Sequence, residues 1–282
     1  MPKRPIPLVK LPSGETVPQL GQGTWRMGES PRKRREEVEA LELGIELGMT
    51  LIDTAEMYGS GGAEEIVGEA IAGRREEIFL VSKVLPDNAS RAGMIAACEW
   101  SLARLGCDFI DLYLLHWRGD IKLAETVAGF EALLREGLIR SWGVSNFDVG
   151  DMEELVALSG GDAVVTDQVL YNLQRRSIEK GLMPWAQRRN IPLMAYSPIE
   201  QGRLLRDPAL NSVAARIRAT PAQVALAWTL RRKDLIVIPK ASSIAHVKEN
   251  RAALDIELSD NDLAALDRAF PPPAGPQPLE FL

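Results

Sequence analysis

Residues 78–116 read IFLVSKVLPDNASRAGMIAACEWSLARLGCDFIDLYLLH, and this stretch decides the fold. It contains two apolar runs, 78–83 and 108–116, of the length that is typical of buried strands. Between them, residues 92–104 repeat apolar side chains with the 3.6-residue period of a helix, and Gly106 follows where a left-handed C-terminal residue is favoured. A strand, a helix and a second strand in succession predict a parallel sheet that is covered by helices.

The same unit recurs along the chain. Eight strand-like runs occur in total, at residues 19–23, 50–53, 78–83, 108–116, 139–146, 163–168, 191–196 and 235–240. Amphipathic stretches predict further helices, among them residues 34–47, 123–135 and 222–230. Eight strand–helix units favour an α/β fold of the closed (β/α)8 TIM barrel type over an open sheet. We expect residues 1–282 to form a single domain of this kind, because such barrels typically take about 250 residues.

The two ends of the chain depart from this unit. Residues 6–18 predict an N-terminal β-hairpin that turns at Ser13 and Gly14. Residues 271–282 begin with three prolines and predict an irregular C-terminal tail on the surface. Because the tail is short, we expect no long wall over the mouth of the barrel.

Composition and charge exclude several classes of function. The chain has 33 basic and 39 acidic side chains, a formal net charge of −6, which argues against a nucleic-acid partner. No apolar run is long enough for a membrane span and no signal-peptide core follows the N-terminus, which predicts a cytoplasmic protein. Cys98 and Cys107 form no C-x-x-C pair and are expected to be reduced thiols. With only two histidines, no metal site is predicted.

Polar or ionisable side chains end nearly every predicted strand. These side chains are Asp53, Lys83, His116, Asn146, Gln168, Tyr196 and Lys240. Active sites of (β/α)8 barrels lie at the carboxyl ends of the strands, so these side chains are expected to share one rim. Trp25 and Trp117 flank the predicted pocket as apolar walls, whereas Trp142 lies within a strand and is expected in the core.

Several segments together carry a family resemblance. Asp53 precedes Tyr58 by five residues in DTAEMYG, with Lys83 on the next predicted strand and His116 on the one after. Further segments are GLIRSWGVSNF at 137–147, AYSP at 195–198, IPK at 238–240 and EN at 249–250. In these segments the chain resembles the aldo-keto reductases, over nearly its whole length. It is most similar to their small bacterial members that reduce methylglyoxal and similar aldehydes.

The resemblance implies that small carbonyl compounds are reduced by hydride transfer, with Tyr58 as the general acid. A hydride that reaches a carbonyl carbon leaves negative charge on the oxygen, and a positioned donor stabilises that charge. A tyrosine pKa of about 10 is too high for ready proton transfer near neutrality. Lys83 is expected to lower the Tyr58 pKa, and Asp53 to hold Lys83. His116 would orient the carbonyl as a neutral hydrogen-bond donor.

The resemblance also implies a set of cofactor contacts. The nicotinamide amide would meet Ser145, Asn146 and Gln168, and its ring would stack on Tyr196. The pyrophosphate would be enclosed by Ser197, Ile199 and Gln201. The 2′-phosphate would meet Lys240, Ser242 and His246, and the adenine Glu249 and Asn250. The remaining cofactor positions are Gly23, Thr24 and Asp53, and the substrate pocket is formed by Trp25, Tyr58, His116 and Trp117.

Two positions depart from the family pattern. His246 stands where many relatives carry an arginine, and Ala241 stands where serine is frequent. A neutral imidazole cannot clamp a phosphate as a guanidinium does. We expect NADP(H) as the preferred cofactor because of Lys240. We expect NAD(H) as a second cofactor because His246 replaces the arginine. The alternative is that His246 is an ordinary exposed helix residue.

Other functions stay open as alternatives at this point. A cofactor-binding regulatory or redox-sensor protein of the same fold would keep these side chains but turn over slowly. A barrel hydrolase could use Asp53, Lys83 and His116. Considered apart from the other rim residues, Asp53 and Lys83 could also be an ordinary buried ion pair. The chain contains neither the G-x-G-x-x-G dinucleotide fingerprint nor the G-x-S-x-G nucleophile elbow. The resemblance implies a monomer whose partner is its small carbonyl substrate.

Overall fold

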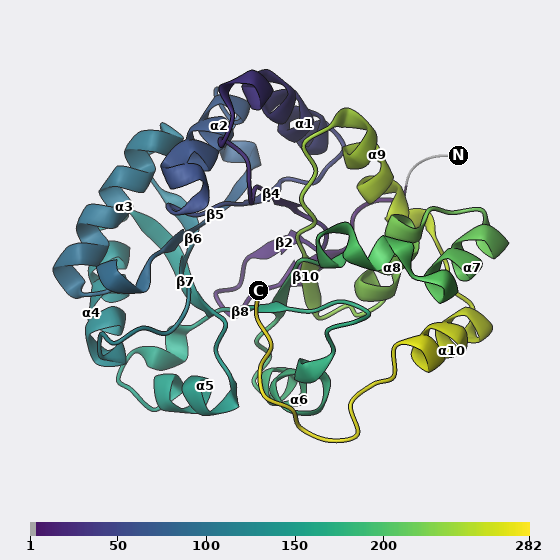
Figure 1. The fold of residues 1–282 in the computed structure, drawn as a ribbon. Helices are drawn as coiled ribbons and strands as arrows, with labels where there is room; N and C mark the ends of the chain where they lie inside the picture. The colour runs from purple at the N-terminus through teal and green to yellow at the C-terminus, as the bar shows by residue number, and fades with distance from the viewer. Residues whose placement is uncertain (1–3) are drawn as a thin grey trace.

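The computed structural model describes residues 4–282 and has the predicted (β/α)8 fold (Figure 1). Its main sheet is parallel, in the order β10-β9-β8-β7-β6-β5-β4-β3. The strands are β3 (Gln22–Gly23), β4 (Leu51–Asp53), β5 (Phe79–Val84), β6 (Ile110–Leu115), β7 (Ile139–Ser145), β8 (Asp167–Leu170), β9 (Leu193–Tyr196) and β10 (Leu235–Val237). Strands that pair are also neighbours along the chain, so the sheet curls steadily around one axis.

Hydrogen bonds between β10 and the segment around β3 close the barrel. The Gly21 amide donates to the Val237 carbonyl (2.9 Å), and the Val237 amide donates to the Gln19 carbonyl (2.7 Å). Past the end of β10, Gly23 and Lys240 pair as a parallel bridge. The loops that follow β3 and β10 therefore leave the same rim side by side.

Helices cover the outer surface of this barrel (Figure 1). They are α1 (Arg34–Glu46), α2 (Gly62–Ala70), α3 (Arg91–Leu105), α4 (Leu123–Glu136), α5 (Val149–Val156), α6 (Leu182–Arg188), α7 (Pro208–Ile217), α8 (Pro221–Leu230), α9 (Ile244–Ala252) and α10 (Asp260–Ala269). Short 3-10 helices lie in the loops, as η1 (Pro31–Lys33), η2 (Tyr58–Gly61), η3 (Arg75–Glu77), η4 (Pro86–Asn88), η5 (Gly161–Ala163), η6 (Ser177–Lys180), η7 (Glu200–Arg206) and η8 (Ala253–Asp255).

Local sequence signals set several helix ends. The Ser90 side chain accepts a hydrogen bond from a backbone amide at the start of α3. Gly106 ends that helix in the left-handed conformation (φ 63°). Gly137 ends α4 in the same way (φ 75°). Thr220 and Gln223 form a reciprocal capping box at the start of α8. The glycine stop predicted at Gly106 is confirmed.

Two apolar cores lie on the two sides of the sheet. The larger one packs between the sheet and the helices and contains Trp142, stacked on Phe130 at a centroid distance of 4.7 Å, so the predicted core position of Trp142 is confirmed. The smaller one fills the barrel interior with the side chains of Leu51, Val81, Leu112, Leu114, Val165, Met194, Ile236 and Ile238, together with Val9, Leu11 and Val17. The last three belong to the predicted hairpin, β1 (Leu8–Lys10) and β2 (Thr16–Pro18), which precedes β3 and packs into the barrel.

Several predicted strand limits are wrong. The first strand, predicted at 19–23, contains only two ladder residues, because its earlier part bonds across the closing seam instead. The strand predicted at 163–168 starts later, at Asp167, because residues Gly161–Ala163 form η5. Proline limits two other strands, because it has no amide to donate to a ladder. Pro192 directly precedes β9, and Pro239 lies two residues after the end of β10.

The tail, residues 271–282, has no helix or strand, as predicted. It does not stay on the outer surface, however. It runs back toward the barrel, and the chain end lies over the centre of the ring in Figure 1. Leu282 lines the cavity at the barrel mouth, so the tail contributes one residue there and no long wall.

Two further sequence expectations concern the cysteines and the membrane. Cys98 is buried and Cys107 is half-buried, and both are free thiols, as predicted. Burial raises the pKa of Cys98 to about 12. No helix within residues 4–282 combines the length and the apolar character that a membrane crossing would need.

Candidate active site

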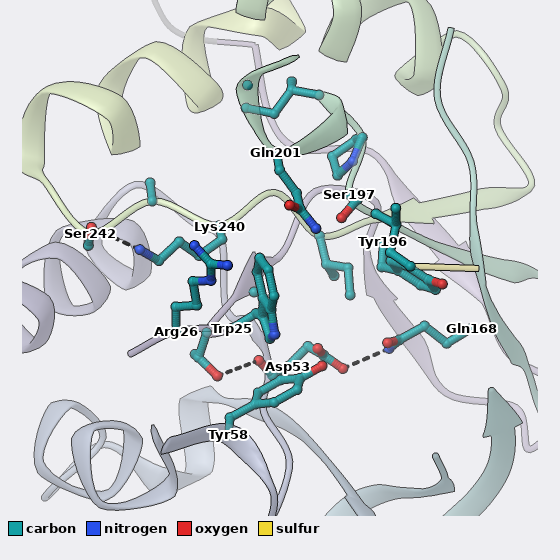
Figure 2. Close-up of a pocket in the computed structure, with 18 of the residues that line it drawn as sticks. Trp25, Arg26, Asp53, Tyr58, Gln168, Tyr196, Ser197, Gln201, Lys240 and Ser242 are labelled. Atoms are coloured by element: carbon teal, nitrogen blue, oxygen red, sulfur yellow. Dashed lines mark hydrogen bonds between the residues drawn. The ribbon is translucent and has the colours of Figure 1, made fainter. Parts of the chain in front are cut away.

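At the carboxyl ends of the strands, polar side chains face the same interior of the barrel as the apolar side chains before them. Side chains alternate between the two faces of a strand. Five residues of the interior core are each followed, two positions later, by a polar residue: Leu51 by Asp53, Val81 by Lys83, Leu114 by His116, Met194 by Tyr196 and Ile238 by Lys240. These polar side chains therefore share one rim, and all but Lys83 line a cavity of about 550 Å³. Figure 2 shows Asp53, Tyr196 and Lys240 around it.

A buried ion pair contacts a tyrosine hydroxyl at this rim. Lys83 Nζ lies 2.9 Å from Asp53 Oδ2 and 2.9 Å from the Thr54 carbonyl oxygen. The lysine side chain is 0% and the aspartate side chain 3% exposed. The same Nζ lies 3.3 Å from the Tyr58 hydroxyl and 4.9 Å from the centre of its ring. Asp53, Lys83 and Tyr58 thus form one chain of contacts, which we call the Asp–Lys–Tyr chain.

Close packing of two loops fixes Tyr58. At Gly59 (φ 57°) an added Cβ would lie 2.8 Å from the Met27 carbonyl oxygen, and at Gly28 (φ 73°) it would lie 2.2 Å from the Gly62 carbonyl carbon. Both positions therefore require glycine, for space and for the left-handed backbone. The loop after β3 is pressed against the loop that carries Tyr58, which holds the hydroxyl opposite Lys83.

Burial sets the protonation state of the Asp–Lys–Tyr chain. Burial alone would lower the pKa of Lys83, but Asp53 and Tyr58 raise it above its ordinary value, so the lysine is charged. Burial raises the pKa of Tyr58, while the Lys83 ammonium lowers it. The expected lowering effect of Lys83 on the Tyr58 pKa is present, but loss of solvation of the phenolate outweighs it, so the net shift of the pKa is upward. Tyr58 is protonated at neutral pH.

His116 faces the tyrosine from β6. Its ring centre lies 5.6 Å from that of Tyr58, edge-on, and 5.0 Å from that of Trp117. Burial, with the nearby Lys83 charge, lowers the pKa of His116 to about 2. Its Nδ1 atom is buried and has no hydrogen-bond partner among residues 4–282. The imidazole is therefore neutral at neutral pH, with one ring nitrogen protonated.

Amide and hydroxyl groups gather beside the Asp–Lys–Tyr chain. Gln168 Nε2 donates to Asp53 Oδ1 (2.7 Å), and Ser145 Oγ donates to the Gln168 carbonyl (2.8 Å). The Tyr196 hydroxyl donates to Asn146 Oδ1 (3.0 Å), and Asn146 has a left-handed backbone (φ 61°). In the described part of the chain no group donates to Gln168 Oε1, which leaves one amide oxygen able to accept a hydrogen bond from a ligand.

Two cations lie close together at the other end of the cavity. Lys240 Nζ donates to Ser242 Oγ (3.0 Å), and the Arg26 side chain points to the same region (Figure 2). Arg26 has a left-handed backbone (φ 64°), and its guanidinium lies 4.4 Å from the centre of the Trp25 ring. His246 is exposed in the first turn of α9 and lines the same cavity.

The loop after β9 closes a further side of the cavity. We call residues 197–206 the β9 loop; it includes η7. Three of its residues have left-handed backbones although they are not glycine: Ser197 (φ 48°), Glu200 (φ 51°) and Gln201 (φ 53°). Such backbones are costly and persist only where surrounding contacts hold them. Ser197, Ile199 and Gln201 all line the cavity.

The cavity brings together all the predicted site residues except Lys83, which lies behind Asp53 and Tyr58. Lining residues that the sequence reasoning missed include Arg26, Met57, Leu205 and Leu282. Arg26 lies three residues after the first strand, but its place beside Lys240 depends on the closing seam, which no local pattern signals. Leu282 had no signal either, because it belongs to an irregular segment.

Comparisons with known proteins find similar sequences and structures over nearly the whole chain. The model of the aldo/keto reductase family matches residues 19–270. The chain is 51% identical, over 280 residues, to methylglyoxal reductase YeaE of Escherichia coli (strain K12), which covers 98% of this chain and 99% of the relative.

Two solved structures from Klebsiella pneumoniae share the fold over almost the whole chain. An aldo/keto reductase in complex with NADP and acetate superposes with a TM-score of 0.95 at 50% identity, and covers 98% of this chain and 99% of its own. An aldo-keto reductase in complex with NADPH gives a TM-score of 0.94 at 49% identity, and covers 99% and 100%.

Proposed function

Because the chain belongs to the aldo/keto reductase family and is thus an oxidoreductase, we propose that it reduces small aldehydes and ketones, methylglyoxal among them, with NADPH as cofactor. The observation that carries this proposal is the buried Asp–Lys–Tyr chain beside a neutral histidine at the rim of the cavity. The relative at 51% identity, which is named as a methylglyoxal reductase, supports the substrate class. The NADP and NADPH complexes of the Klebsiella proteins support the cofactor.

Tyr58 is the proton donor in this proposal. Its phenol is protonated at neutral pH, since burial raises its pKa. Negative charge that develops on a carbonyl oxygen next to the hydroxyl draws the proton across, and the phenolate that remains faces Lys83 Nζ at 3.3 Å. The ammonium thus stabilises the product of proton transfer rather than the resting phenol. A positioned acid of this kind typically contributes about 10²- to 10⁴-fold in rate.

Asp53 balances the charge that Lys83 introduces. A lysine side chain with 0% exposure would lose its proton without a partner, and the 2.9 Å contact with the carboxylate keeps it charged. Gln168 holds the second carboxylate oxygen at 2.7 Å, which fixes Asp53 in turn. His116 remains neutral and can donate one hydrogen bond to the same carbonyl oxygen without adding a second positive charge.

The donor set of the cavity fits a nicotinamide dinucleotide. NADPH, when bound, supplies the hydride. Gln168 Oε1 is free to accept from a carboxamide, Ser145 and Asn146 lie beside it, and the Tyr196 ring forms the adjacent wall. Lys240, Ser242 and Arg26 supply a charged and hydroxyl-bearing pocket of the kind that binds phosphate.

The walls of the cavity favour a small substrate. Trp25 and Trp117 are 37% and 39% exposed, and both line the cavity beside Tyr58 and His116. Leu282 of the tail adds an apolar contact on the same mouth. The apolar contacts at this mouth are few, which gives a bulky ketone little remote surface to bind.

A reductase screen tests the proposal directly. Methylglyoxal and a set of small aldehydes are offered with NADPH and, separately, with NADH, and consumption of the reduced cofactor is followed over many turnovers. Steady turnover with NADPH is the expected result. If bound NADPH is oxidised once and no aldehyde supports further turnover, the regulatory alternative is favoured and the enzymatic proposal is wrong.

A further inference from the structure

The loop after β8 holds the β9 loop through a buried carboxylate. Glu200, 1% exposed, accepts hydrogen bonds from Asn172 Nδ2 (2.8 Å), from Arg175 Nε and Nη2 (3.2 Å each) and from Arg203 Nη2 (2.9 Å). Asn172 Nδ2 also donates to the Ser197 carbonyl (2.9 Å). Burial would raise the pKa of Glu200, but its hydrogen bonds with Asn172 and Arg175 lower it, so the carboxylate is ionised. These contacts fix the left-handed backbone of the β9 loop.

The backbone of Arg175 is itself fixed. The buried Asn172 side chain accepts hydrogen bonds from the Gln174 and Arg175 amides at 2.9 and 3.0 Å, and the backbones of Asn172 and Arg175 also bond each other in both directions. The backbone turn fixes where the side chain starts, and the two contacts with Glu200 limit the freedom of the guanidinium before it binds a second partner.

The third nitrogen of the same guanidinium reaches the tail. Arg175 Nη1 lies 2.9 Å from Glu280 Oε1, while Nε and Nη2 contact Glu200. The start of the tail is held by the neighbouring residue Arg176, whose Nη1 donates to the Phe270 carbonyl (2.6 Å). Two successive arginines thus anchor both ends of the tail, and only Arg175 also contacts the β9 loop.

The position of Glu280 gives this contact a consequence for the site. Glu280 precedes Leu282 by two residues, and Leu282 lines the cavity together with Tyr58 and His116. On the basis of the proposed function, we infer that Arg175 is a positioning residue that links the β9 loop on the cofactor side to the tail on the substrate side. Ordering of the β9 loop by cofactor then favours ordering of the tail over the substrate.

A purely structural role for Arg175 makes a different prediction. If the guanidinium only neutralises the buried Glu200, then loss of Glu280 changes neither the β9 loop nor the response of the tail to cofactor. Glu280→Gln separates the two roles, because it weakens the outer contact and leaves all donors to Glu200 in place. Glu257→Gln is the matched control, since it makes the same change in an exposed ion pair with Arg4.

Amide hydrogen exchange provides the main test. The amides of the β9 loop and of residues 279–282 are followed in the whole protein with and without NADPH. In the parent chain and in Glu257→Gln, NADPH is expected to slow exchange in both segments. In Glu280→Gln, NADPH should still slow exchange in the β9 loop, but it should slow exchange in residues 279–282 far less. Equal slowing of both segments in Glu280→Gln would overturn the link.

The same measurement distinguishes failure of the link from failure of the proposed function. If NADPH slows exchange in neither segment of the parent chain, no cofactor binds and the proposed function itself is wrong. If NADPH slows only the β9 loop of the parent, cofactor binds but the two segments are not linked.

Kinetics supply a second readout. Glu280→Gln should raise the KM for the aldehyde by up to about fivefold, as expected for a half-exposed ion pair, with kcat and NADPH affinity nearly unchanged. Arg175→Lys keeps the charge but cannot contact both carboxylates with a planar fork, so it should raise both the aldehyde KM and the NADPH Kd. Adding Glu280→Gln to Arg175→Lys should have little further effect on KM. Independent, multiplicative effects of the two changes would contradict a link through one guanidinium.

Discussion

Lys83 Nζ lies 3.3 Å from the Tyr58 hydroxyl, and the same nitrogen lies 2.9 Å from Asp53 Oδ2. One buried ammonium therefore contacts both a phenol and the carboxylate that balances its own charge. Because the phenol is protonated at rest, the ammonium in the proposed mechanism stabilises the negative charge that proton transfer leaves on Tyr58. This relationship leads to separate predictions for the hydroxyl, for the ion pair and for the neighbouring histidine.

Tyr58→Phe removes the proposed proton donor and little else. We expect kcat for aldehyde reduction to fall by about 10²- to 10⁴-fold, the usual contribution of a positioned acid. NADPH affinity should be nearly unchanged, because the proposed cofactor contacts do not include the hydroxyl. Single-turnover kinetics and a fluorescence titration with NADPH measure the two quantities. Activity within tenfold of the parent would remove Tyr58 from the role of general acid.

Lys83→Met tests the buried pair through stability. The change leaves the Asp53 carboxylate, 3% exposed, without its counter-charge, and we expect a loss of about 3–5 kcal/mol in the free energy of unfolding. The double variant Asp53→Asn/Lys83→Met removes both charges and should recover much of that loss. Urea denaturation of the three proteins gives the values. A double variant no more stable than Lys83→Met would show that the unpaired charge is not the cause.

His116 should make the fold less stable in mild acid. Its pKa is lowered to about 2 in the folded protein, against about 6.5 in an unfolded chain. Below pH 6.5 the unfolded chain therefore binds a proton that the folded protein refuses, so stability falls as the pH falls. Between pH 6.5 and 5 this single group should cost about 2 kcal/mol.

The contribution of His116 is isolated by comparison with His116→Gln. Between pH 7 and pH 5, the free energy of unfolding should fall by about 2 kcal/mol more in the parent than in this variant. His246→Gln is the control, because His246 is exposed in the first turn of α9. An equal loss in the parent and in His116→Gln would mean that the folded protein can protonate this imidazole.

The sequence predicted the rim of the barrel well because the rim obeys a local rule. Asp53, Lys83 and His116 each continue an alternating strand by two residues, so their shared face follows from the period of the strand alone. Charge effects were harder to predict. The Tyr58 pKa depends on how deeply the phenol is buried, and the loop packing at Gly28 and Gly59 sets that depth.

Long-range contacts account for what the sequence did not predict. The tail has no periodic pattern, and its course depends on Arg175 and Arg176, about a hundred residues earlier in the chain. Arg26 was passed over for a different reason. Its importance depends on the closing seam, where Gly23 pairs with Lys240 and brings the loops after the first and last strands together. A pairing between the ends of a barrel is not visible in any local window.

Small, activated carbonyl compounds should be better substrates than bulky ketones. Trp25, Trp117 and Leu282 confine the mouth of the cavity, so a steroid finds little extended surface from which binding energy can be drawn. We expect methylglyoxal or a nitrobenzaldehyde to have a higher kcat/KM than any steroid ketone in the same assay. A steroid that exceeds every small aldehyde tested would show that the tail or the rim loops move aside.

Lys240 should be the main discriminator between NADPH and NADH. It is held at the closing seam by its bridge to Gly23, and its ammonium already contacts the Ser242 hydroxyl, so a 2′-phosphate at this position would meet a charge and a hydroxyl together. Lys240→Ala should weaken NADPH binding by about 1.5–3 kcal/mol, the usual worth of a charge-assisted contact, and change NADH binding little. Arg26→Gln should weaken NADPH less, because Arg26 is exposed and its charge is screened by salt.

The same reasoning predicts the effect of restoring a guanidinium at the position where this chain has histidine. His246→Arg should tighten NADPH and leave NADH nearly unchanged, because a planar guanidinium binds phosphate through two hydrogen bonds. Dissociation constants for both cofactors, measured at low and high salt, test all three variants. An equal loss for NADPH and NADH in Lys240→Ala would mean that this lysine supports the seam or the pyrophosphate. The preference for NADPH would then have to come from another group on this rim.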